Sequence, residues 1–187
     1  YRAVGSQSLA VCGLDFSYGC LHGVLKWVIA EHGVEALGEA YKYCNPETDR
    51  PRAHQCQHAI GHGLFSYFGY EDASLLKALS VCEHDFYEDP INGCVGGVFM
   101  ESNLYSMLGP VIEARSPEGN WYGQCPTVPM QFKEACNIWL AQWWYEYYRT
   151  QHIPNERIFS RLGELCRGVP GQYMRGCFER VGQMIAH

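Results

Sequence analysis

The sequence predicts an all-α fold: a right-handed solenoid of about five αα-hairpin repeats, cross-linked by disulfides in short loops. Three observations predict it. The chain has ten cysteines in 187 residues, the cysteines fall into close pairs, and helix-like apolar runs recur between the pairs. Even, regularly spaced cysteines are typical of disulfides in an oxidising compartment. Metal–thiolate sites favour Cys-x2-4-Cys spacing, which is absent, so we expect a secreted, periplasmic or similarly oxidising location.

The cysteine pairs set the phase of the predicted repeats. Paired cysteines lie 8, 12, 12, 11 and 11 positions apart, and the second members recur every 36, 38, 42 and 41 residues. Such a period is the signature of a stacked supersecondary unit. The repeats should start near residues 20, 56, 94, 136 and 177 within a single domain over 1–187. The expected disulfides are Cys12–Cys20, Cys44–Cys56, Cys82–Cys94, Cys125–Cys136 and Cys166–Cys177.

One repeat consists of a first helix after the second cysteine, a turn, and a second helix that runs into the next cysteine. In the first copy these are Val24–Ile29, His32-Gly33 and Glu35–Cys44. Segments between paired cysteines, such as Glu88–Gly93, are rich in turn formers and are predicted to be loops. The polar loop Ser116–Asn120 predicts that the second helix of the third repeat is short or broken.

Both ends of the chain are out of phase with the repeat. Ser8–Cys12 has the pattern of a second helix without its first, and Cys177–Ile185 that of a first helix without its second. A solenoid normally carries polar caps at its ends. Three explanations stay open: a fragment of a longer array, disordered flanks, or a head-to-tail contact in which one copy completes the next and builds a ring or filament.

This period and cysteine placement resemble the Sel1-like and tetratricopeptide class of helical-hairpin repeats, especially its disulfide-bridged members. The resemblance implies that successive hairpins are joined through a short Cys–Cys loop. It covers the whole chain in period but not the Sel1 consensus, because the Leu-Gly-x-x-Tyr core does not recur from repeat to repeat and the Gly-x-Gly-Val turn is absent. It therefore implies an architecture and no functional residue.

Aligning the repeats on the second cysteine places candidate metal ligands in one register. His22 and His58 lie two positions after it, His62 and Met100 lie six positions after it, and Glu101 comes next. Offsets of four share one face of a helix. Equivalent first helices stack side by side in a solenoid, so we expect these side chains to converge on one surface.

Such a group would suit zinc or copper, and a methionine ligand would favour copper. Haem with His/Met ligation is less expected, and the Cys-x-x-Cys-His motif of covalent haem attachment is absent. The alternative is that the histidines hydrogen-bond carbonyl groups across tight helix contacts. Five glycines would permit such contacts: Gly23, Gly61, Gly63, Gly96 and Gly97.

Two other side-chain clusters have competing interpretations. Trp139, Trp143, Trp144 and Tyr147 lie on one predicted helix, where they either pack a core or form a platform that binds a partner. The carboxylates of Glu83–Asp89 lack the ligand rhythm of a calcium loop and indicate a solvated acidic loop.

Charge and motifs exclude several function classes. The net charge of −6, with dispersed Lys and Arg, argues against a nucleic-acid partner. No apolar run is long enough for a transmembrane segment, and motifs of nucleophilic or nucleotide-dependent enzymes are absent. Three hypotheses remain. The leading one is a scaffold that binds a protein partner or itself; the others are a metal- or haem-binding module and a metalloenzyme.

Overall fold

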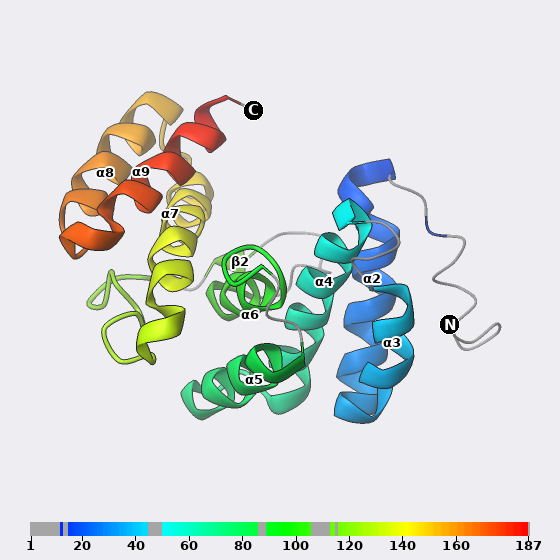
Figure 1. Ribbon diagram of the computed structural model, residues 1–187. Coiled ribbons are helices and arrows are strands. Elements are labelled where there is room, and N and C mark those ends of the chain that lie inside the picture. The colour runs from blue at the N-terminus through cyan, green and yellow to red at the C-terminus, as the bar shows by residue number, and fades with distance from the viewer. Residues whose placement is uncertain are drawn as a thin grey trace. The chain divides into compact units, whose positions relative to one another are not determined.

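The computed structural model describes residues 12, 15–44, 50–85, 89–105, 113–114 and 116–186. This part of the chain is helical, as predicted, apart from turns and a pair of two-residue strands (Figure 1). In chain order the elements are α2 (Asp15–His32), the 3-10 helix η1 (Gly33–Ala36), α3 (Leu37–Tyr43), α4 (Arg50–Phe68), α5 (Asp72–Asp85), α6 (Cys94–Asn103), β1 (Leu104–Tyr105), β2 (Glu113–Ala114), the 3-10 helix η2 (Met130–Phe132), α7 (Lys133–Thr150), α8 (Asn155–Arg167) and α9 (Gly171–Ile185).

The chain divides into two compact units, Tyr1–Val98 and Phe99–His187. In the first, α4 packs against both α2 and α5. In the second, α7, α8 and α9 pack against one another, and β1 pairs with β2 in antiparallel register. The single domain and the solenoid arrangement stay predictions.

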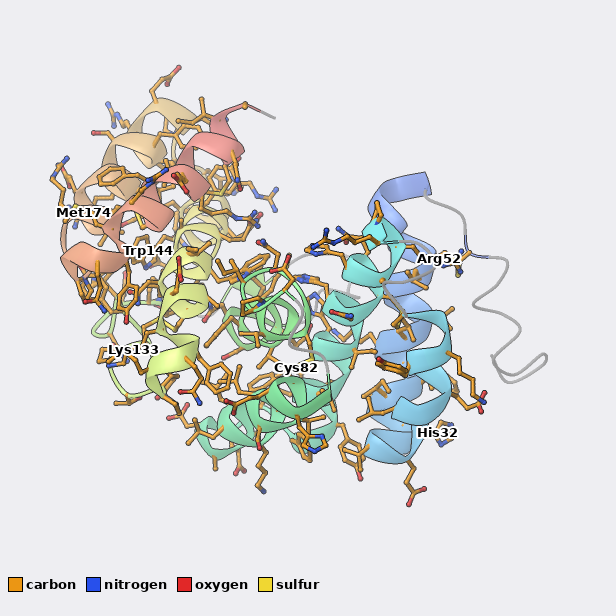
Figure 2. The ribbon with its side chains drawn as sticks, in the orientation of Figure 1. His32, Arg52, Cys82, Lys133, Trp144 and Met174 are labelled. Carbon is orange, nitrogen blue, oxygen red and sulfur yellow. A yellow bond between two sulfur atoms is a disulfide. The ribbon has the colours of Figure 1, made fainter. Side chains whose placement is uncertain are left out.

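All five predicted disulfides form, and no cysteine is free. Their Cα–Cα distances run from 5.2 to 5.7 Å, within the ordinary range for a disulfide. Cys82 of α5, labelled in Figure 2, is bonded to Cys94 at the start of α6. Five disulfides suggest an oxidising environment. None of the described helices is long and apolar enough to cross a membrane.

The turns that separate the helices fall where the sequence places them. Gly33 and Gly69 adopt φ of 59° and 92°, which favours glycine. Between α6 and α7 the described residues contain no α-helix, in agreement with the short or broken helix predicted for the third repeat. The predicted helical tail Ser8–Cys12 lies outside the described residues except for Cys12.

Among the described residues, the prediction that segments between paired cysteines are loops holds for the turn over residues 168–170 but is wrong for the residues that lead into Cys56 and Cys177. α4 begins at Arg50 and α9 at Gly171, each six residues before the second cysteine of its pair. Two prolines of these segments sit at helix starts: Pro51 in the first turn of α4, and Pro170 at the N-cap of α9. Proline suits these positions, because the first-turn amides have no partner within the helix. The turn before Cys94, over residues 89–93, is confirmed.

α4 approaches its neighbours closely enough that glycine is required at the contacts. A Cβ atom at Gly61 would collide with the carbonyl oxygen of Cys94, and one at Gly97 with the carbonyl oxygen of His58. A Cβ atom at Gly63 would lie 2.6 Å from Cβ of Ile29 on α2. The backbones of α4 and α6 are therefore in direct contact, and α2 packs closely on the same helix.

Gly97→Ala should lower the free energy of unfolding by about 1–3 kcal/mol, because the added methyl group meets backbone that must move. Gly23→Ala is the matched control. Gly23 lies inside α2, and a Cβ atom at this position would have no neighbour within 4 Å. The free energy of unfolding of this variant should therefore rise by roughly 0.5–1 kcal/mol. Urea unfolding measures both. Equal stability of the two variants would contradict the close contact.

Candidate metal centre

Three histidines from two helices come together in the first unit. His22 lies on α2, and His58 and His62 lie on α4, which runs beside α2 (Figure 1). One ring nitrogen from each residue lies within 4.8 Å of the other two. The ring centroids are 4.8 Å apart for His58 and His62, 5.6 Å for His22 and His58, and 6.0 Å for His22 and His62. His58 and His62 are buried, and His22 is partly exposed.

The local sequence explains this convergence. His58 and His62 are four residues apart on α4, so their rings lie one above the other on one face. His22 has the same place relative to Cys20 as His58 has relative to Cys56. The close contact of Gly63 with Ile29 brings α2 near enough for His22 to reach the pair.

The two other predicted ligands belong to the second unit. Met100 and Glu101 lie on α6, where Met100 is partly exposed and Glu101 is fully buried. Neither is among the three residues whose nitrogens come together. Their participation in the site stays a prediction.

His58 is held in one orientation by a backbone group. Its Nδ1 lies 2.6 Å from the carbonyl oxygen of Asn92. A carbonyl oxygen only accepts, so Nδ1 carries the hydrogen and donates it, which leaves a lone pair on Nε2 of the neutral ring. Burial of the ring, followed by the nearby His62, lowers the pKa of His58 well below its ordinary value, although the bond to Asn92 acts in the opposite direction. His58 is therefore neutral near pH 7, which is the form that binds metals.

This donor set fits a borderline transition-metal ion. Imidazole suits zinc and copper, and a Zn–N bond of about 2.0–2.1 Å in tetrahedral geometry places ligand nitrogens roughly 3.3–3.4 Å apart. The three nitrogens, all within 4.8 Å of one another, would have to close by roughly 1.5 Å or less to reach that spacing. Because every cysteine is in a disulfide, no thiolate competes for the ion.

The alternative role for these histidines, a hydrogen bond to a carbonyl across a tight helix contact, is also present at His58. The two roles are compatible, because ligating histidines usually donate their other N–H to a carbonyl or carboxylate. The close-contact prediction holds for Gly61, Gly63 and Gly97 but is wrong for Gly23, which faces open space.

The aromatic side chains of α7 pack in the second unit. Trp139, Trp143 and Trp144 are buried, and Nε1 of Trp144 (Figure 2) donates to the carbonyl oxygen of Trp121. This burial fits the core-packing alternative. Tyr147 is partly exposed, and its hydroxyl donates to the carboxylate of Glu118 at 2.7 Å. A partner-binding role for this cluster stays a prediction.

The sequence interpretation missed the residues that support His58. From the sequence, Asp89 is expected in a solvated acidic loop. In the structure, its carboxylate accepts hydrogen bonds from the amides of Ile91 and Asn92. The available signal was Asp89-Pro90, because an aspartate before proline often starts a turn that its own side chain stabilises. Asn92 acts through its backbone carbonyl. Every residue has such a group, so the sequence gives no signal for this role.

The chain matches no protein-family model, no curated protein and no solved structure. The likeness to Sel1-like and tetratricopeptide repeats therefore remains a resemblance in period and cysteine placement.

The metal-free protein should become less stable as pH falls from 7 to 5. The lowered pKa keeps His58 neutral in the folded state, whereas a histidine in the unfolded chain takes up a proton below about pH 6.5. The unfolded state then binds more protons, so the free energy of unfolding decreases. In His58→Gln the decrease should be smaller. Urea unfolding at both pH values measures it, and an equal decrease in the two proteins would contradict the lowered pKa.

Proposed function

We propose that this protein binds a Zn²⁺ or Cu²⁺ ion through His22, His58 and His62, and that it works in an oxidising compartment outside the cytoplasm. The observation that carries the proposal is the convergence of three imidazole nitrogens from two helices within 4.8 Å. His22, from one helix, joins an i, i+4 pair on the other, which is the usual way in which helices present imidazoles to one ion.

The burial of the group supports binding rather than packing alone. His58 and His62 are only 7% and 3% exposed, so an ion held by their nitrogens would lie in a region of low dielectric, where electrostatic attraction is stronger than in water. Burial, followed by the nearby His62, also makes protonation of His58 unfavourable, as its lowered pKa reflects. A metal cation would not need that protonation, because the neutral ring donates a nitrogen lone pair to the ion.

The proposal is metal binding and does not extend to catalysis. A catalytic zinc site combines three protein ligands with an open position for water and a base beside it. The three ligand atoms that come together are imidazole nitrogens, and one of the residues, His22, is partly exposed. This arrangement supports an ion held near the surface of the first unit. The scaffold, self-assembly, haem and metalloenzyme hypotheses stay predictions.

The oxidised protein, freed of bound metal after purification, should bind one Zn²⁺ or Cu²⁺ per chain in isothermal titration. His58→Gln and His62→Gln should each weaken binding by more than the 10–100-fold that loss of an outer-shell partner costs, because a ligand itself is lost. His22→Gln should do the same.

His32→Gln is the matched control for these variants. His32 lies in the last turn of α2 (Figure 2), is exposed, and is not one of the three grouped histidines. Its titration should equal that of the wild type. A flat trace for the wild type with both metals, or equal binding by His58→Gln, would overturn the proposed function.

A further inference from the structure

We infer that Asp89 is the positioning residue of the metal centre: it holds the turn whose Asn92 carbonyl orients His58. The inference rests on the proposed function and deepens it, because it names a residue that would control metal affinity without contacting the ion.

The hydrogen bonds of the turn connect Asp89 to His58 through one residue. Oδ1 of Asp89 accepts from the amide of Ile91 at 3.0 Å and from the amide of Asn92 at 2.8 Å. The carbonyl of the same Asn92 accepts from Nδ1 of His58 at 2.6 Å. The backbone carbonyl of Asp89 closes the turn by accepting from the amide of Gly93 at 3.1 Å. The Asn92 carbonyl shares its peptide plane with the Gly93 amide, which donates to the Asp89 backbone, and the Asp89 carboxylate fixes the preceding peptide plane. Asp89 therefore holds the turn on both sides of the Asn92 α-carbon.

Asp89 also contacts the helix that carries the ligands. Its Oδ2 lies 3.0 Å from Nδ1 of His54, one helical turn before His58 on α4. The two side chains are 33% and 31% exposed, so solvent screens this pair and its contribution is small. The bonds to the two backbone amides, rather than the pair with His54, should carry the effect.

The turn is seated directly on α4. A Cβ atom at Gly93 would lie 2.8 Å from the backbone oxygen of Asp89 and 3.4 Å from Oε1 of the buried Gln57. The next residue, Cys94, is bonded to Cys82 of α5. The turn is thus anchored after Gly93, and within the turn the Asp89 carboxylate is what holds the Asn92 amide.

Outer-shell partners of a ligating histidine fix its tautomer and ring orientation, and their loss typically weakens metal binding 10–100-fold. Without the Asp89 carboxylate, the peptide group between Ile91 and Asn92 loses the bond that fixes its plane, and Asn92 is then held only through the Gly93 amide. The Asn92 carbonyl can then turn away from Nδ1, and the Nε2 lone pair of His58 is no longer directed at the ion.

The experiment titrates the full-length oxidised protein with Co²⁺, whose visible spectrum reports ligand number and geometry, and with Zn²⁺ in competition. Asp89→Ala should weaken binding 10–100-fold and change the Co²⁺ spectrum at saturation. Asp89→Asn should bind within about threefold of the wild type, because an amide oxygen accepts the same two backbone hydrogen bonds. His54→Gln is the control for the ion pair and should also stay within about threefold.

The outcomes separate this inference from the proposed function. Equal binding and an unchanged spectrum in Asp89→Ala would overturn the inference and leave the metal site standing. A loss in Asp89→Asn as large as in Asp89→Ala would also overturn it, because the effect would then follow charge. A wild type that binds neither metal would overturn both. If Asp89→Ala does not fold, Asp89→Ser replaces it: its single hydroxyl should give a smaller loss, and no loss would overturn the inference.

Discussion

The direct contact between the backbone of α4 and its neighbours is the constraint on which the rest of the first unit depends. Gly61 and Gly97 bring α4 against α6, and Gly63 brings it against α2. Interiors are packed as densely as organic crystals, so such contacts have little freedom to shift. The same helix carries His58 and His62, so this contact also determines where the imidazoles lie.

A disulfide and a set of hydrogen bonds together position the turn that contacts His58. Closing a loop of about 12 residues restricts the unfolded chain and should stabilise the fold by about 3 kcal/mol. The bond between Cys82 and Cys94 closes the segment that contains the Asp89 turn. The disulfide thus ties the end of the turn to α5, and hydrogen bonds hold the Asn92 carbonyl toward His58. The site depends on both the disulfide and the hydrogen bonds, because the Asn92 carbonyl can orient the His58 ring only if the turn lies next to it.

Sequence periodicity predicted more of the fold than of the site. The spacing of the cysteines predicted all five disulfides, because pairing partners lie close along the chain. The apolar runs between the pairs predicted the helical class. Helix starts were misplaced, because Pro51 and Pro170 favour a first turn or a cap as readily as a loop. The register of His22 with His58 was visible from the repeat. The support from Asn92 was not, because it comes from a carbonyl whose position depends on tertiary contacts.

The central claim is that three imidazoles share one ion, and X-ray absorption at the metal edge of the zinc- or copper-loaded protein tests it most directly. We expect nitrogen scatterers at about 2.0–2.1 Å with the outer-shell pattern of three imidazole rings. This coordination should be lost in the protein that lacks all three of His22, His58 and His62. A sulfur shell at about 2.3 Å, or a shell of oxygen atoms without imidazole scattering, would contradict it.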